Sequence, residues 1–160
     1  MSPRIGHGWD AHRLVEGRRC FLGGVEVPSD AGPEGHSDGD VVLHALADAL
    51  LGTAAAGDLG SVFGTADPAF AGAPSERFVV EALRRAGSPE VLNVDVTVVG
   101  ERPRIGAYRD AMRERIAALL GVPVDRVSVK ASSGNGLTDF GRGDGVAATV
   151  VLLVEGRGGR

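Results

Sequence analysis

The chain has 160 residues, a hydrophobic content of 43%, a charged content of 24% and a formal net charge of −4. This length and composition are typical of a single globular domain, and the acidic balance argues against a protein that binds nucleic acid through general electrostatics. Its single cysteine, Cys20, excludes an intramolecular disulfide and a cysteine-based zinc site. The sequence has neither a signal-peptide core nor an apolar run of membrane-spanning length, so we expect a cytoplasmic protein without membrane contact.

The first half of the chain predicts two strand segments and one helix. Residues 3–8 and 20–28 have strand-like patterns, and the second can bend into a hairpin at its Gly-Gly pair. Apolar residues recur at helical spacing from residue 41 to residue 50, which predicts a helix there. Ser37 and Asp38 precede this helix as candidate N-caps.

The second half predicts further helices and strands in the order α-β-α-β-β. Residues 58–74 are rich in Gly, Ala and Pro, which predicts a long loop, and loops of this length are commonly functional. The predicted elements are, in chain order, 75–87, 93–100, 106–121, 126–132 and 146–155. This order predicts an α+β domain with helices on one face of a mixed sheet. We expect the domain to span residues 1–155, with a flexible tail at 156–160.

The stretch GHGWDAH, residues 6–12, contains three side chains that can bind a metal. Asp10 and His12 are two residues apart, so on an extended backbone their side chains point the same way, as two ligands of one metal must. His7 lies an odd number of residues from Asp10 and would point to the other face. The structural alternative is that this Asp-x-His pair is an ordinary polar surface feature.

A second group of polar residues lies in the first predicted helix. Asp40, His44 and Asp48 stand at i, i+4 and i+8 and would form one polar stripe. His44 could complete a set of one carboxylate and two imidazoles, with a fourth position open for substrate. Asp48 could accept the other ring N–H of His44. The alternative is that the stripe is simply solvated.

Two further segments have the composition of phosphate-binding loops. His36 immediately precedes a helix start, where free N–H groups suit phosphate oxygens, although the segment could serve only to cap the helix. Residues 130–145 combine Lys130, serine hydroxyls, glycines and Arg142, which is consistent with a phosphate-binding nest or with a glycine-rich hairpin. Residues 101–106 could be an ordinary turn.

These motifs together resemble one known family. GHGWDAH, HSDGDVVLHALADALLG, GDLG, DPAF, NVDVTVVGERPRIG and GRGDG stand in the order and spacing of 2-C-methyl-D-erythritol 2,4-cyclodiphosphate synthases of the non-mevalonate isoprenoid pathway. The resemblance covers roughly residues 4–155. It implies a ferredoxin-like two-layer α+β sandwich, assembled as a homotrimer with active sites between subunits. It also implies that the 2-phosphate of a cytidine diphosphate-linked methylerythritol attacks the β-phosphate and expels CMP.

The resemblance also assigns roles to residues of this chain. Asp10, His12 and His44 would bind one Zn²⁺ per subunit, and no metal role is implied for His7. His36 and Ser133 would stabilise the transition state. Substrate contacts would come from Ser37, Asp58, Leu59, Gly60, Phe63, Asp67, Gly100, Pro103, Arg104, Ile105, Gly106, Ala131, Ser132, Asn135, Phe140 and Arg142.

The chain departs from the family pattern near the expected diphosphate. Asn135 stands where the family usually has a glutamate that helps to hold Mg²⁺ or Mn²⁺ between the α- and β-phosphates, and neutral Asn is a poorer ligand. Asp139, Asp144 or water could compensate, or this cation could bind weakly. Phe140 comes one position later than the usual aromatic. Thr149 stands where some members have a glutamate that pairs with the arginine equivalent to Arg142.

Two other functions are compatible with the same residues. A non-catalytic trimeric paralogue would keep the zinc and bind a nucleotide or an isoprenoid diphosphate without turnover, as the altered loop 132–140 suggests. A metal-dependent phosphohydrolase is disfavoured because the sequence lacks an evident carboxylate-rich cluster for two metals.

Overall fold

The protein, described here from a computed structural model that covers residues 2–64, 68 and 71–156, is an α+β sandwich with one main sheet. The strands are β1 (Ser2–Glu16), β2 (Phe21–Leu22), β3 (Val25–Glu26), β4 (Ala31–Pro33), β5 (Glu90–Val99), β6 (Val127–Ser132) and β7 (Gly145–Gly156). The helices are α1 (Val41–Thr53), α2 (Leu59–Phe63), α3 (Glu76–Arg85) and α4 (Arg109–Leu120), with short 3₁₀ turns η2 (Gly106–Tyr108) and η3 (Val124–Arg126). Among the described residues, no helix is both long and apolar enough to cross a membrane.

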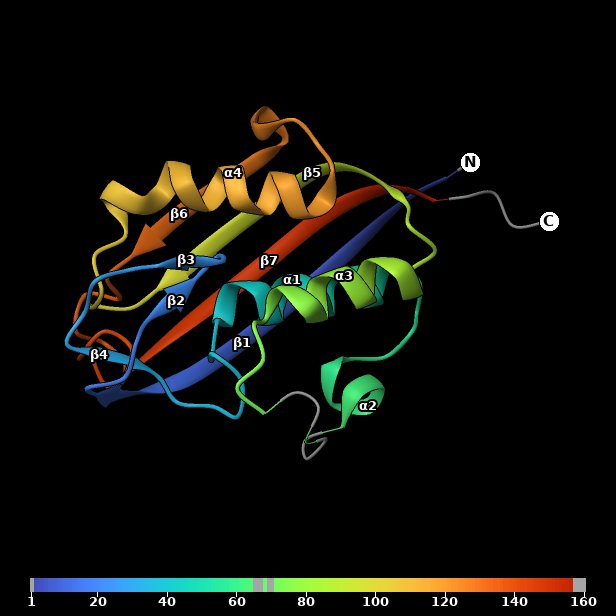
Figure 1. The fold of residues 1–160 in the computed structure, drawn as a ribbon. Helices are drawn as coiled ribbons and strands as arrows, with labels where there is room; N and C mark the ends of the chain where they lie inside the picture. Colours follow the sequence, from blue (N-terminus) through green and yellow to red (C-terminus); the bar gives the residue numbers. More distant parts are fainter. Residues whose placement is uncertain (1, 65–67, 69–70, 157–160) are drawn as a thin grey trace.

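The main sheet is mixed, as the sequence predicted. Its strand order is β4-β1-β7-β5-β6, and β2 pairs with β3 in a separate hairpin. Strand β7 runs antiparallel to β1 and to β5, whereas β5 and β6 are parallel. Helices α1, α3 and α4 lie on the same side of this sheet (Figure 1). The predicted helices on one face of a mixed sheet are therefore confirmed.

Strand β1 is much longer than the predicted strand at residues 3–8. It pairs with β7 from Ser2 to Arg13 and then with β4 from Leu14 to Glu16. The sequence underestimated it because its glycines and polar residues hide the alternation that normally marks a strand. The extension matters because it places Asp10 and His12 in the strand rather than in a loop.

Helix α1 is buried between the sheet and α3, which explains why its sequence is apolar almost all round. All of its residues are buried except His44, Asp48 and Gly52. The predicted N-caps Ser37 and Asp38 are wrong, because the fully buried Asp40 caps this helix and accepts N–H bonds from Val42 and Leu43. Asp40 therefore belongs to the helix end and not to an exposed stripe.

Two glycines of β1 allow α1 to lie directly on that strand. A Cβ atom on Gly6 would lie 1.9 Å from the carbonyl oxygen of Ala49, and one on Gly8 would lie 1.8 Å from that of Ala45. Both distances are far inside van der Waals contact, and both obstacles are backbone atoms of a buried helix. Only glycine fits at these two positions.

We predict that Gly8→Ala will destabilise the protein by about 3 kcal/mol or more, because the added methyl group overpacks a rigid backbone contact. The matched control is Gly106→Ala, where an added Cβ meets nothing within 4 Å. Urea denaturation of both variants measures the effect. Equal stabilities of the two variants would contradict this explanation of the glycine.

Candidate metal centre and surrounding active site

Three polar side chains from two elements meet on the helix side of the sheet. Asp10 and His12 are on β1, and His44 comes from the first turn of α1. Asp10 Oδ2 lies 2.9 Å from His12 Nε2 and 3.0 Å from His44 Nδ1, and one ligand atom of each residue lies within 4.8 Å of the other two. In a tetrahedral zinc site with bonds of ~2.0 Å, ligand atoms are roughly 3.3 Å apart. The three atoms are therefore spaced for one shared ion.

The surroundings of the His12 Nε2 atom are consistent with a metal at this position. It is buried and has no hydrogen-bond partner among the described residues, although Asp10 lies close to it. Buried polar atoms without a partner are rare in folded proteins. Two imidazoles and one carboxylate form a donor set that zinc uses in catalytic sites with one open position. The residues present fit zinc, with the lone pair of His12 Nε2 available to the ion.

The electrostatics of the cluster keep its carboxylate ionised. Burial by itself would raise the pKa of Asp10, but the adjacent His12 and His44 side chains outweigh burial and lower that pKa. The contact with the Asp10 carboxylate raises the pKa of His12, and burial opposes this effect only in part. A proton therefore competes with a metal for His12 at a higher pH than it would for an isolated imidazole.

The other edge of the His44 ring meets two serine hydroxyls. His44 Nε2 lies 3.1 Å from Ser37 Oγ and 2.9 Å from Ser75 Oγ. The prediction that Asp48 accepts this ring N–H is wrong, because Asp48 Oδ1 accepts the backbone N–H of Leu59 at 2.8 Å. That N–H lies at the start of α2, where backbone donors lack partners within the helix.

Sequence reasoning missed Ser75 as a neighbour of the metal cluster. It precedes α3 and reads as a helix cap, but its side chain makes no capping hydrogen bond and is fully buried against His44. No local signal connects two residues that are 31 positions apart. His7, by contrast, is exposed and lies on the opposite face of β1 from Asp10.

Asp48 connects the predicted methylerythritol contacts on α2 to α1, the helix that also carries His44. Asp48 Oδ1 accepts the backbone N–H of Leu59, the residue after Asp58, and burial raises the pKa of Asp48. Asp58 caps α2 and accepts the backbone N–H of Ser61 at 2.8 Å, and this bond lowers the pKa of Asp58. Gly60 follows within α2, whereas the predicted contact Asp67 lies outside the described residues.

The loop before α1 carries two more predicted site residues, His36 and Ser37. Arg18 holds this loop, because its Nη2 atom donates to the carbonyl oxygens of Gly35 at 2.8 Å and of Ser37 at 2.7 Å. His36 is exposed, and its carbonyl accepts the N–H of Gly72 at 2.6 Å. Arg18 is a second residue that the sequence did not reveal, since nothing in its local context links it to residues 35–37.

The two segments predicted to bind cytidine lie side by side. The N–H of Gly100 donates to the carbonyl of Ser132, and the N–H of Glu101 donates to that of Phe140, each at 2.9 Å. Ser133 Oγ accepts the N–H of Asn135 at 3.2 Å within the same turn. Of the other predicted contacts, Ile105 is buried, Pro103 is half-buried, and the exposed ones are Arg104, Gly106, Ala131 and Arg142.

A cavity of about 350 Å³ lies between residues 11–13 of β1 and the loop before β7. Its lining includes His12 and Arg13 from β1, and Asp139, Phe140 and Asp144 from the loop. The predicted substrate contact Phe140 thus borders the same hollow as a candidate metal ligand.

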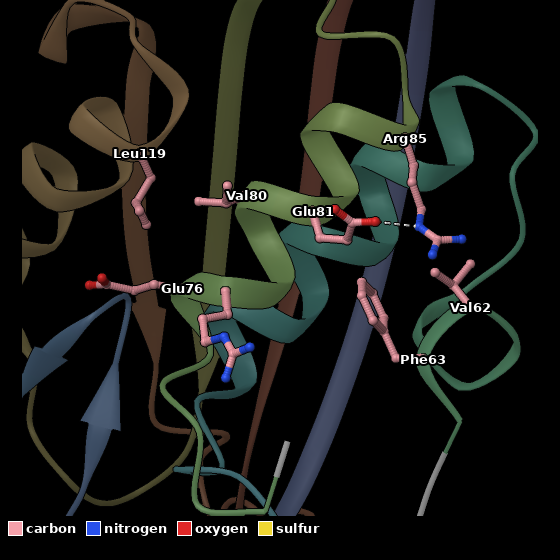
Figure 2. Close-up of a pocket in the computed structure, with 8 residues that line it drawn as sticks. Val62, Phe63, Glu76, Val80, Glu81, Arg85 and Leu119 are labelled. Atoms are coloured by element: carbon pink, nitrogen blue, oxygen red, sulfur yellow. Dashed lines mark hydrogen bonds and ion pairs between the residues drawn. The ribbon is translucent and has the colours of Figure 1, made fainter. Parts of the chain in front are cut away.

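A larger cavity of about 630 Å³ lies on the outer face of α3 (Figure 2). Val62 and Phe63 from α2 lie at one side of it, near Arg85 of α3. The Phe63 ring contacts Phe78 edge-to-face with centroids 5.2 Å apart, and Phe78 contacts His44 in the same way at 5.5 Å. The predicted substrate contact Phe63 is therefore one aromatic ring removed from the cluster.

Comparison with known proteins identifies the family. The sequence model of the YgbB family matches residues 3–155. The chain belongs to the YgbB family. A relative from Symbiobacterium thermophilum, named 2-C-methyl-D-erythritol 2,4-cyclodiphosphate synthase, is 56% identical over 156 residues, which cover 96% of this chain and 99% of the relative.

Solved structures named as the same synthase share the fold of this YgbB chain. One has a TM-score of 0.87 at 40% sequence identity, and a second, named as a form bound to CDP, has a TM-score of 0.84 at 38%. Each comparison covers 95% of this chain and 100% of the other. The predicted fold class is confirmed at this level.

We predict that this YgbB protein binds one Zn²⁺ and that His12→Ala weakens the binding at least ~100-fold, because one of three ligands is lost. Competition with a chromophoric chelator measures the affinity. Binding should weaken as the pH falls through the raised pKa of His12, since the metal needs the neutral imidazole. His7→Ala is the control, and equal losses for the two variants would contradict the assignment.

Proposed function

We propose that this chain converts 4-diphosphocytidyl-2-C-methyl-D-erythritol 2-phosphate to 2-C-methyl-D-erythritol 2,4-cyclodiphosphate and CMP. The observation that carries this proposal is the convergence of Asp10, His12 and His44 on one point. It occurs in a chain that is 56% identical to a relative named as the synthase of this cyclic product. The proposed enzyme is a phosphorus–oxygen lyase of isoprenoid biosynthesis.

The proposed reaction needs no nucleophile from the protein. An oxygen of the substrate's 2-phosphate forms a bond to the β-phosphorus. The bond from that phosphorus to the oxygen shared with the α-phosphate breaks, and CMP leaves with this oxygen. The protein then contributes mainly by folding the substrate so that attacking and leaving oxygens are in line, and by balancing phosphate charge.

Each part of the proposed site has a separate task. Asp10, His12 and His44 would hold the zinc, which would supply Lewis acidity toward the phosphate oxygens. His36 and Ser133 donate hydrogen bonds to phosphate oxygens as charge develops on them. Ser37 lies beside His36 on the loop that Arg18 fixes, so this loop is held in place before substrate arrives.

The organic parts of the substrate are assigned to the flanking segments. The Asp58 carboxylate accepts hydrogen bonds from the methylerythritol hydroxyls. The same part of the substrate contacts Leu59, Gly60, Phe63 and Asp67. The cytidine binds where the loops at 100–106 and 131–132 adjoin. Phe140 and Arg142 provide further contacts to the substrate. The hydrogen bond from Gly100 to Ser132 supports this arrangement because it joins the two loops into one surface.

We also propose that a second cation, Mg²⁺ or Mn²⁺, would neutralise charge on the substrate's diphosphate, and that Asn135 would help to hold it. Asn135 lies in the turn after β6, with φ of 51° and its N–H bonded to Ser133 Oγ. Its neutral amide is a weaker Mg²⁺ ligand than a carboxylate, so this cation binds less tightly than in relatives with glutamate at this position.

The active unit is proposed to be a homotrimer with sites between subunits. Gly6 and Gly8 of β1 face α1, so Ile5 and Trp9 point to the opposite face of the sheet. Val151 of β7, which pairs with His7, lies on that same face, and all three apolar side chains are exposed. Large apolar side chains that cluster on one face mark an interaction surface. Sedimentation of the purified protein at three times 16.4 kDa supports this assembly, and a monomer at micromolar concentration contradicts it.

The proposed setting is the bacterial cytoplasm, with a small-molecule partner only. The formal net charge of −4 supports the expectation that the protein does not bind nucleic acid, and we expect no membrane association.

We predict that the zinc-loaded protein with Mg²⁺ releases CMP and the cyclic diphosphate in equal amounts. His36→Ala should lower kcat about 100-fold, because one donor to the transition state is lost, and leave zinc affinity unchanged. Val124→Ala, at an exposed position of η3, is the control. Quenched-flow assays with phosphorus NMR of the products measure the outcome.

Two results of this assay contradict the proposal. Binding without any product would identify a non-catalytic paralogue that holds a nucleotide or an isoprenoid diphosphate. Release of linear hydrolysis products would identify a phosphohydrolase.

We predict that Asn135→Glu lowers the Mg²⁺ concentration for half-maximal rate about tenfold, because the added carboxylate is a better ligand for the cation. The control is Ala118→Glu, which adds the same charge at an exposed position on α4, away from the sheet face proposed for the trimer contact. A Mg²⁺ dependence that is the same in the variant and in the wild-type protein would show that residue 135 does not contact the cation.

A further inference from the structure

A buried chain of hydrogen bonds leads away from the metal cluster through His44. Beyond His44 Nε2 lies Ser75 Oγ at 2.9 Å, and beyond Ser75 Oγ lies Asp38 Oδ1 in a short hydrogen bond. Ser75 is fully buried and Asp38 is half-buried. The three residues come from α1, from the residue before α3 and from the loop before α1, so the chain links three segments.

The direction of these hydrogen bonds is set by Asp38. A carboxylate only accepts hydrogen bonds, so the single proton of the Ser75 hydroxyl is donated to Asp38 Oδ1. The carboxylate is fixed in this orientation because Oδ2 accepts the N–H of Ser75 and Oδ1 accepts the N–H of Asp40, each at 3.0 Å. Ser75 Oγ therefore presents only lone pairs to the ring of His44.

An oxygen that offers only lone pairs requires a proton on the nitrogen that faces it. His44 Nε2 must then carry the N–H, and the lone pair of the neutral ring is on Nδ1. Nδ1 is the atom that lies 3.0 Å from Asp10 Oδ2, at the position where the ligand atoms converge. We propose that Ser75 and Asp38 are positioning residues that fix the tautomer of His44, so that Nδ1 is presented to the metal.

Ser37 is compatible with the same arrangement. Its hydroxyl lies 3.1 Å from His44 Nε2 and 3.5 Å from Ser75 Oγ, and it accepts the N–H of Gly39 at 3.2 Å. When Ser37 donates its proton to Ser75 Oγ, its own lone pairs also face the ring. Both serines then favour the same tautomer.

The arrangement is a longer form of a common feature of metal sites, in which a carboxylate accepts the second N–H of a histidine ligand. Here a hydroxyl group lies between the two. Loss of such outer partners typically costs 10–100-fold in metal affinity. The inference rests on the proposed zinc site, but it does not depend on the proposed reaction.

The test combines zinc affinity with NMR of zinc-loaded protein labelled with ¹⁵N-histidine. Ser75→Ala should weaken zinc binding about 10–100-fold and speed the solvent exchange of the Nε2–H proton of His44, which then has Ser37 as its remaining hydroxyl acceptor. Asp38→Asn keeps the shape of the side chain, but both oxygens of Asp38 accept hydrogen bonds. In either orientation the amide N–H₂ group of Asn would therefore face a donor, so this variant should weaken zinc binding by a similar factor. Ser75→Thr keeps the hydroxyl and should retain binding.

Ser29→Ala removes a hydroxyl that accepts the N–H of Ala31, and this variant should bind zinc as the wild-type protein does. Thermal unfolding of the metal-free variants separates misfolding from loss of the ligand position. Wild-type affinity in both Ser75→Ala and Asp38→Asn, or an unchanged exchange rate of the Nε2–H proton in Ser75→Ala, would overturn the inference. A wild-type chain without zinc affinity would overturn it together with the zinc site, whereas zinc binding without cyclic product would contradict the reaction alone.

Discussion

The contact between α1 and β1 is the constraint on which the rest of the structure depends. Gly6 and Gly8 leave no room for a side chain between the strand and the carbonyls of α1, so the helix lies against the strand backbone. Only at this distance can His44, in the first turn of α1, reach Asp10 on β1. The candidate metal centre can therefore form only because residues 6 and 8 are glycines without a Cβ atom.

Three polar residues spaced one turn apart organise the surroundings of the metal centre: the helix cap Asp40, and His44 and Asp48 of α1. Asp40 caps the helix and also accepts N–H bonds from Gly23 and Gly24, at 2.9 and 2.7 Å, which fixes the β2-β3 hairpin. His44 joins the cluster on one edge of its ring and the serine hydroxyls on the other. Asp48 binds the first N–H of α2 and so fixes the segment proposed to hold the methylerythritol. A helix that is otherwise apolar thus positions three separate parts of the proposed site.

The sequence predicted the features that depend on local patterns or on recognisable motifs. Helical spacing predicted α1, and the Asp-x-His spacing predicted that Asp10 and His12 share a face of an extended segment, as they do. Features that depend on tertiary contacts were missed or wrong. Asp48 was assigned to His44 because helical spacing places it one turn away, but its Oδ1 accepts the first N–H of α2 instead. Ser75 could not be found, because its role exists only once α3 packs beside α1.

The central claim is that Asp10, His12 and His44 hold one zinc ion, with His44 bound through Nδ1. A crystal structure of the zinc-loaded protein, with anomalous diffraction measured on both sides of the zinc absorption edge, tests it most directly. The account predicts one anomalous peak per subunit at about 2.0–2.2 Å from His12 Nε2, His44 Nδ1 and an Asp10 oxygen. A peak bound to His44 Nε2, or a peak away from these three residues, would contradict it.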